Sequence, residues 1–230
     1  MIFETVAQLK LATLAAGKLV STKGYYASGD GGAADYIVAA TQAVDGYGDH
    51  AIANSTVALL QSSALIDVRQ YGAEGNGTTD DTAAIQAALD TDSTEVYFSE
   101  GSYRIVNSTT SPALTSAVAD RRIYGTGVIT ATDQVKKALQ VTGANTVVDG
   151  LQIDGNDFIG FAIEMASLNP IVRDCYIHDL NGFSNWGAIA IRLDFDGLDT
   201  SALICNNVIK NLQGVGDGTG GNGVGMQRAI

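Results

Sequence analysis

Isoleucines at a fixed spacing constrain the fold of this chain more than any other sequence feature. Ile105, Ile129, Ile153 and Ile177 recur at a constant interval of 24, and Ile209 follows at an interval of 32. A fixed period in this range is typical of a solenoid, in which each repeat forms one coil. The longer last interval fits one coil with an eight-residue insertion.

The residues around these isoleucines support the same alignment. Residues 148–153 match residues 172–177 and 204–209, with Asp, Asn or Gly two to four positions before each isoleucine. A second apolar row, Leu139, Ile163 and Ile191, has intervals of 24 and 28. These rows predict a mainly β parallel β-helix with two strands per coil, an internal isoleucine ladder and Asp, Asn or Gly at the corners. A β-sandwich with chance spacing is the disfavoured alternative.

The segment before the coils, residues 67–90, predicts a short helix at their N-terminal end. Thr78 is placed to cap this helix and acidic residues suit its first turn. Ile85 and Leu89 lie on one apolar stripe, so we expect them to close the core of the first coil. Asp80 and Asp81 are expected to support this cap through helix capping and turn hydrogen bonds. A strand, turn and strand pattern follows in EVYFSEGSYRI.

Residues 1–62 differ from the rest and predict a small α+β module. Thr5 and Gln8 have the spacing of a capping box and Gly17 that of a C-cap, which predicts a helix over residues 6–16. Short strands are expected in KLVST and DYIVAA, on either side of a Gly-Asp-Gly-Gly turn. The boundary to the β-helix, residues 63–230, is expected near Gln61 to Ala64.

Composition excludes several classes of function. The net charge of −12 gives no general support for binding phosphate backbones, so nucleic acid is not expected as a partner. No apolar run approaches the roughly 20 residues of a membrane span, so membrane insertion is not expected either. Cys175 and Cys205 are expected to be reduced and packed, and no cofactor or metal is predicted.

Two segments resemble known protein families. DVRQYGAEGNGTTDDTAAIQAALD with VYFSEGSYRI resembles the opening of pectate-lyase-like parallel β-helix proteins, and KLVSTKGYYASGDGGAADYIV is similar to N-terminal modules of bacteriophage tailspikes and tail fibres. The resemblance implies a right-handed, homotrimeric β-helix that binds host surface polysaccharide. It also implies that the N-terminal module, with Tyr25 and Tyr26 exposed, docks on a phage tail or baseplate protein. The protein would then be made in the host cytoplasm and assembled into the virion.

Candidate catalytic residues are few. Asp194 and Asp196 at i and i+2 would share one face of an extended segment, about 7 Å apart, which suits inverting glycoside hydrolysis. A solvated acidic turn is the alternative. Trp186 could stack on a sugar or form a packing lid. An EF-hand is excluded because Cys205 stands where a calcium loop that begins at Asp194 requires Glu.

Other residues offer weaker support for catalysis. Arg173, Arg192 and Lys210 are candidate lyase groups or plain surface charges. His50 and His178 are isolated in the sequence, so a nucleophilic triad has no support.

Three functions therefore stay open. The first is a structural and adhesive virion component, and the second is a polysaccharide depolymerase of the hydrolase or lyase type. The third is a free pectin-type enzyme, which is disfavoured because the chain lacks the secretion signal that such an enzyme needs. We also expect these residues to be the front part of a longer working unit. An active site is then expected on later coils or between subunits.

Overall fold

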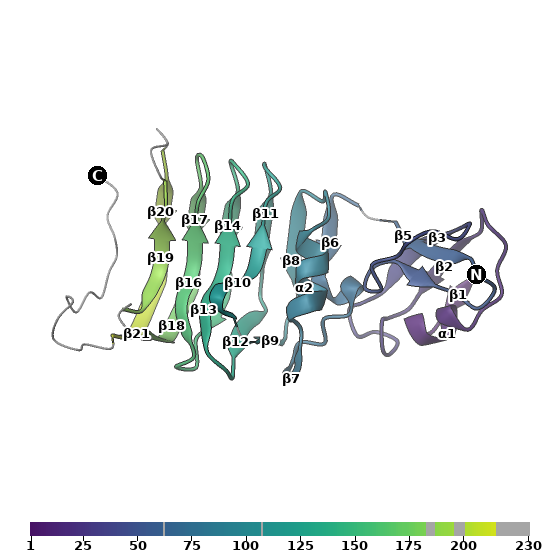
Figure 1. The fold of residues 1–230 in the computed structure, drawn as a ribbon, viewed down its shortest axis with the longest axis horizontal. Coiled ribbons are helices and arrows are strands. Elements are labelled where there is room, and N and C mark those ends of the chain that lie inside the picture. Colours follow the sequence, from purple (N-terminus) through teal and green to yellow (C-terminus); the bar gives the residue numbers. More distant parts are fainter. Residues whose placement is uncertain (62, 107, 183–186, 196–200, 215–230) are drawn as a thin grey trace.

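The computed structural model describes residues 1–61, 63–106, 108–182, 187–195 and 201–214, with only the backbone of residues 108–111. Figure 1 shows an elongated molecule with a small α+β module at one end and a stack of parallel strands in the rest. Two hydrophobic clusters correspond to these parts, one in the module and one that runs along the inside of the coils.

Three parallel sheets enclose the core of the coils. Sheet I contains β6 (Leu65–Asp67), β8 (Glu95–Phe98), β11 (Arg122–Gly125), β14 (Val147–Asp149), β17 (Ile171–Arg173) and β20 (Leu203–Cys205). Sheet II contains β7 (Asn76–Asp80), β9 (Ser102–Ile105), β12 (Val128–Ala131), β15 (Gln152–Asp154), β18 (Tyr176–Asn181) and β21 (Val208–Gln213). Sheet III contains β10 (Ser108–Ser116), β13 (Val135–Val141), β16 (Ile159–Met165) and β19 (Ile189–Leu193). The predicted mainly β parallel solenoid is confirmed.

The predicted ladders are correct except at one position. Ile129, Ile153, Ile177 and Ile209 pair in register, and so do Leu139, Ile163 and Ile191. Ile105 is the exception, because Tyr103 is the residue paired with Ile129 and Ile105 pairs with Ala131. This coil is therefore longer than the constant interval assumes, and the matching isoleucine was a coincidence of spacing.

The prediction of two strands per coil is wrong. Residues 148–153 and their equivalents form two strands in different sheets, separated by Gly150, Asp174 and Asn206 with φ values of 68°, 56° and 56°. Gly, Asp and Asn tolerate this left-handed backbone, so the chain turns a tight corner there. The predicted placement of these residue types at the corners is confirmed.

A second corner carries a ladder of polar side chains that the sequence pattern did not predict. Asn145 donates to Asp120 over 2.8 Å, and Asn169 donates to Asn145 over 3.1 Å. All three residues have positive φ. Stacked amide and carboxylate groups thereby link successive coils at the corner where the chain passes from sheet III to sheet I.

The helix α2 (Thr82–Leu89) covers the N-terminal end of sheet III (Figure 1). Ile85 and Leu89 are fully buried in the core of the coils. The Gln86 side chain accepts from the Thr115 amide over 2.8 Å and donates to its carbonyl over 3.0 Å, as a neighbouring strand would. The helix thus satisfies part of the edge of β10 that would otherwise be unpaired.

The start of this helix differs from the prediction. Thr78 lies in β7 and does not cap the helix, because the chain stays extended until Asp81, which takes the N-cap position without a side-chain cap bond. The buried Asp81 carboxylate instead accepts from the amides of Glu74 and Gly75 over 2.7 and 3.1 Å, and Asp80 accepts from the Thr82 amide over 3.0 Å. Asp81 therefore holds the preceding turn rather than the helix.

The N-terminal module forms a five-stranded sheet in the order β1-β2-β3-β5-β4 beside one short helix. Its elements are β1 (Ile2–Phe3), α1 (Val6–Lys10), β2 (Leu19–Thr22), β3 (Ala34–Ala39), β4 (His50–Ala51) and β5 (Val57–Leu60). Thr5 caps α1 as predicted, but the helix ends at Lys10 and not at residue 16. Tertiary contacts replace the helix beyond Lys10, because the Leu14 amide donates to the Asn54 side chain and the Leu14 carbonyl accepts from it. In the described parts of the chain, no helix has the length and apolar character to cross a membrane.

The module contacts the coils through the short helix η1 (Val68–Tyr71) and the residues beside it. Tyr26 donates its hydroxyl to the Gly72 carbonyl over 2.9 Å, and Arg69 donates to the Asp30 carbonyl over 3.1 Å. Tyr25 is half-buried against Tyr26, whereas Tyr26 is 56% exposed. The tyrosine pair therefore lies at the junction of the module and the β-helix.

Because His50 is buried, we expect the stability of the module to depend on pH. The imidazole is fully buried between the rings of Tyr25 and Tyr36, and neither nitrogen has a hydrogen-bond partner in the described part of the chain. Burial, helped by Lys10, lowers the pKa of His50 from 6.5 to about 3. Between these values the unfolded chain binds a proton that the folded module excludes, so stability should fall as the pH falls below about 6.5.

The expected slope is up to about 1.4 kcal/mol per pH unit. Denaturant unfolding from pH 7 to pH 4 should show this slope as the difference between the wild type and His50→Phe, which cannot titrate. Equal pH profiles for the two proteins would show that His50 is not held neutral.

Candidate functional site

A cluster of ionisable side chains lies on the outer face of sheet II. His178 Nδ1 is 2.6 Å from Asp179 Oδ2 and 3.7 Å from Asp154 Oδ1. Asp154 and His178 are paired in register on β15 and β18. The prediction that His178 is isolated is therefore wrong, because one of its partners comes from the preceding coil.

The contacts of the imidazole indicate which nitrogen carries the proton. Nδ1 faces two carboxylates, whereas Nε2 lies 3.4 Å from the side-chain nitrogen of Gln152, which is a donor. From these partners we assign the proton to Nδ1 and the lone pair to Nε2. Hydrogen bonds from His178 and Asn211 lower the pKa of Asp179, which keeps the orienting carboxylate charged.

Two further groups complete this cluster. The ring of Tyr176 lies 4.5 Å from that of His178, and Lys210 Nζ lies 5.3 Å from the Tyr176 ring centre. A phenol, an imidazole oriented by a carboxylate and an amine thus share one face. Such a set can move protons to and from a bound substrate.

The same cluster could hold a divalent cation. Ligand atoms of Asp154, His178 and Asp179 lie within 4.8 Å of one another. However, His178 Nδ1 and Asp179 Oδ2 are already joined by a 2.6 Å hydrogen bond, so a cation bound at these two atoms would have to replace it. The geometry therefore suits acid–base chemistry better than metal binding.

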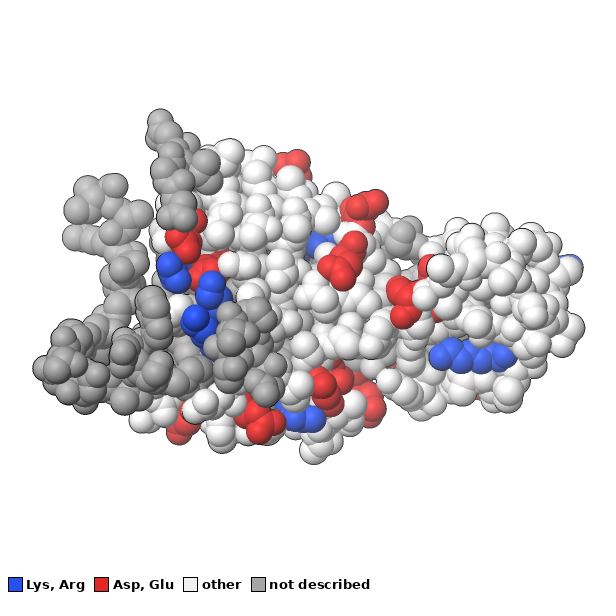
Figure 2. Space-filling model, in the orientation of Figure 1, with Lys and Arg blue, Asp and Glu red and all other residues white. Residues whose placement is uncertain are grey.

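Asp194 lies in a second polar cluster, on sheet III. Its Oδ2 is 3.0 Å from Arg192 Nη2, and Arg192 Nη1 is 3.1 Å from Glu164 Oε2. Glu164 is fully buried and also bonds Lys137 over 2.5 Å and Gln140 over 2.6 Å. Figure 2 shows positive and negative side chains close together over β16 and β19, with further acidic side chains elsewhere on this face.

This network limits what Asp194 can do. One guanidinium lies between the two carboxylates, so Asp194 and Glu164 are both held in ion pairs with Arg192. Asp196 and Trp186 lie outside the described residues. The catalytic role of Asp194 and Asp196 and the glycan contact of Trp186 stay predictions.

The remaining candidates fall on separate faces. Arg173 lies on sheet I with Asp149, away from Lys210 on sheet II. Cys175 is buried, and burial raises the pKa of its thiol to about 11, while Cys205 is half-buried and both thiols are free. The structure therefore brings together Arg192 with Asp194, and His178 with Lys210.

Comparison with known proteins finds one family whose model matches part of these coils. A family model described as "Rhamnogalacturonase A/epimerase, pectate lyase-like" matches residues 65–168, from the first strand of sheet I to beyond β16. The coils are similar to this family over these residues. No curated protein matches the sequence.

Solved structures share the fold of this chain. The tailspike protein gp49 of Acinetobacter baumannii bacteriophage Fri1, a capsular polysaccharide depolymerase, matches 91% of the chain with a TM-score of 0.60 and 15% identity. Pantoea stewartii WceF, a glycan biofilm modifying enzyme with a tailspike-like parallel β-helix, matches 91% with a TM-score of 0.61 and 13% identity. The enzymatically active domain of bacteriophage CBA120 tailspike protein 4 matches 89% with a TM-score of 0.53 and 12% identity. The chain spans 46%, 38% and 33% of the lengths of these three structures.

Proposed function

We propose that the protein is a phage tailspike component whose β-helix binds bacterial surface polysaccharide. One observation carries this proposal: the match to the Fri1 tailspike and to WceF extends over 91% of the chain, so it includes the N-terminal module as well as the coils. Polar clusters on the outer faces of sheets II and III supply groups that could contact a glycan.

Binding to cells tests this function. Fluorescently labelled full-length protein should bind encapsulated bacteria of a responsive strain and lose binding to an isogenic strain without its surface polysaccharide. Equal binding to both strains would contradict polysaccharide recognition.

Attachment to the virion is the second part of the proposal. The module of residues 1–62, with Tyr25 and Tyr26 at its junction, would dock on a tail or baseplate protein, and the spike would be a homotrimer, the symmetry that places three modules on one attachment point. Deleting residues 1–62 should abolish incorporation into phage particles while leaving cell binding intact. A stable monomer in sedimentation at micromolar concentration would contradict the trimer.

A polysaccharide depolymerase is the second candidate function, and the Asp179–His178 pair favours it. If His178 acts as a general base, His178→Gln should lower the rate of polysaccharide shortening by about 10² to 10⁴. Asp194→Asn is the matched control, and we expect it to keep most of the activity because Asp194 is paired with Arg192.

Size-exclusion chromatography of the labelled polysaccharide measures this rate, and circular dichroism shows whether each variant is folded. Full activity in His178→Gln would exclude this cluster and favour an active site on later coils or between subunits. A hundredfold loss in Asp194→Asn would instead place the catalysis on sheet III.

A further inference from the structure

A groove lies where the N-terminal module meets the outer side of α2. One wall is the loop between β3 and β4, which contributes Asp45 and Tyr47, and the other wall is α2, which contributes Ala83 and Ala87. The groove has a volume of about 400 Å³, within the range of roughly 300–1,000 Å³ that is usual for ligand sites. Because the two walls come from different parts of the chain, a ligand in the groove would contact the module and the β-helix together.

The sequence of α2 explains why the groove is open on this side of the helix. Ala83 is exposed and Ala87 is half-buried, and the two lie one turn apart on the same side of the helix. Their side chains are single methyl groups, which leave space beside the helix. Gln86 and Asp90 are also one turn apart, and Gln86 donates to the Asp90 carboxylate over 2.7 Å. The helix therefore offers a small apolar surface with a fixed carboxylate at its end.

Carboxylates on both walls make the groove acidic. Asp45 and Asp90 are exposed, and neither has an ion-pair partner in the described part of the chain. Among these described residues, no lysine or arginine lines the groove. The Arg121 cation interacts with Asp90, but its side chain is fully buried and donates to carbonyl groups at the end of α2. The groove is therefore open to a cation from another molecule.

The negative charge of this loop also acts inside the module. Asp45 Oδ1 accepts from the amides of Tyr47 and Asp49, each over 2.8 Å, which fixes the carboxylate in the loop. Burial raises the pKa of Asp49, and the charge of Asp45 raises it further. Burial also raises the pKa of Tyr71, and both aspartates add to this shift. A cation in the groove would offset the repulsion between these groups.

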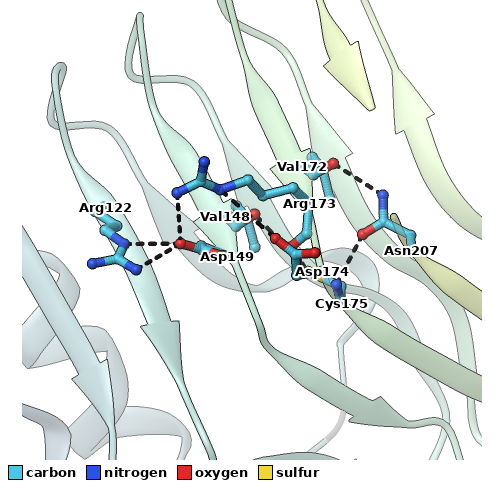
Figure 3. Close-up of polar contacts among 8 residues, drawn as sticks. All are labelled: Arg122, Val148, Asp149, Val172, Arg173, Asp174, Cys175 and Asn207. Carbon is cyan, nitrogen blue, oxygen red and sulfur yellow. Dashed lines mark hydrogen bonds and ion pairs between the residues drawn. The ribbon is translucent and has the colours of Figure 1, made fainter. Parts of the chain in front are cut away.

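Carboxylates on sheet I differ from those in the groove because they are paired with cations of the same chain. Figure 3 shows Asp149 with Arg122 and Arg173, at distances of 2.6 and 2.9 Å, and Asp174 lies 4.0 Å from Arg173. The charges of that network are already matched within the chain. Those of Asp45 and Asp90 are not, so the groove is the better place for a basic partner.

We propose that this groove holds a basic segment of the tail or baseplate protein on which the module docks. The inference rests on the proposed function and names the chemistry of its partner. A lysine or arginine side chain would place its charge between Asp45 and Asp90, and its aliphatic part against the alanines and the ring of Tyr47. A second copy of the chain is a poor occupant, because it carries the same net charge of −12.

A labelled peptide tests the groove. A fluorescein-labelled peptide with four lysines alternating with alanines should bind the full-length protein, less tightly as salt rises, and the same peptide with glutamate for lysine should not bind. Asp45→Asn and Asp90→Asn should each weaken binding about tenfold or more, because each removes a charge-assisted contact but keeps the oxygen that accepts within the protein. Asp133→Asn removes the same charge from an exposed position on the coils and should leave the affinity unchanged.

Incorporation into phage particles tests the partner. Ala83→Arg places a cation of the chain's own in the groove and should lower incorporation of the full-length protein about tenfold or more. Ala119→Arg adds the same charge at an exposed position on the coils and should be incorporated as the wild type is. Circular dichroism shows whether each variant is folded.

Four results would overturn the inference. These are failure of the wild type to bind the lysine peptide, unchanged affinity in both Asn variants, normal incorporation of Ala83→Arg, and altered sedimentation of the Asn variants, which would make the groove a contact between copies of the chain. Deletion of residues 1–62 separates this failure from that of the proposed function. If the deletion abolishes incorporation while Ala83→Arg enters particles as the wild type does, the groove is wrong and attachment through the module stands.

Discussion

Replacing Arg121 with Met is expected to lower the free energy of unfolding by about 3–5 kcal/mol, because it removes a buried cation that holds several carbonyl groups. The Arg121 side chain is fully buried, and its guanidinium donates to the carbonyls of Leu89, Thr91 and Ser93, the last two just beyond the end of α2. A cation is favoured at this end of a helix, and each buried carbonyl left without a donor costs about 1–3 kcal/mol. Methionine fills much of the volume but donates no hydrogen bond.

Denaturant unfolding of the full-length protein measures this effect. Lys18→Met removes the same charge at an exposed position and should change stability by less than about 0.5 kcal/mol. If Arg121→Met were as stable as that control, the guanidinium would not hold the end of α2.

Leu89→Ala is expected to cost about 2–4 kcal/mol, the usual range for a leucine truncated in a core. Leu89 is 1% exposed in the core of the coils, and its removal leaves a cavity that strands fixed in three sheets cannot fill by collapse. Leu11→Ala is the matched control, because Leu11 is 81% exposed. A loss below about 0.5 kcal/mol for Leu89→Ala would show that α2 does not close the core.

The sequence predicted those parts of the fold that repeat with a constant spacing. Ile129, Ile153 and Ile177 pair as expected because each of these coils has the same length. The interval fails at Ile105 because that coil is longer. The third sheet was missed because a single left-handed residue, such as Gly150, divides what looks like one continuous strand.

The candidate sites were predicted less well because they join residues from different coils. Asp149 and Arg173 are separated by the same interval as the isoleucines of the ladder, and so are Asp154 and His178. That interval would have paired these polar residues had it been applied to them. It does not connect Glu164 to Arg192, because the coil between them is longer.

Hydrogen–deuterium exchange tests most directly the claim that the β-helix, and not the module, recognises polysaccharide. The full-length protein is compared with and without purified polysaccharide from a strain that it binds. We predict slower exchange in strands of the coils between β11 and β18, and unchanged exchange in residues 1–62. Protection confined to residues 1–62 would contradict the account.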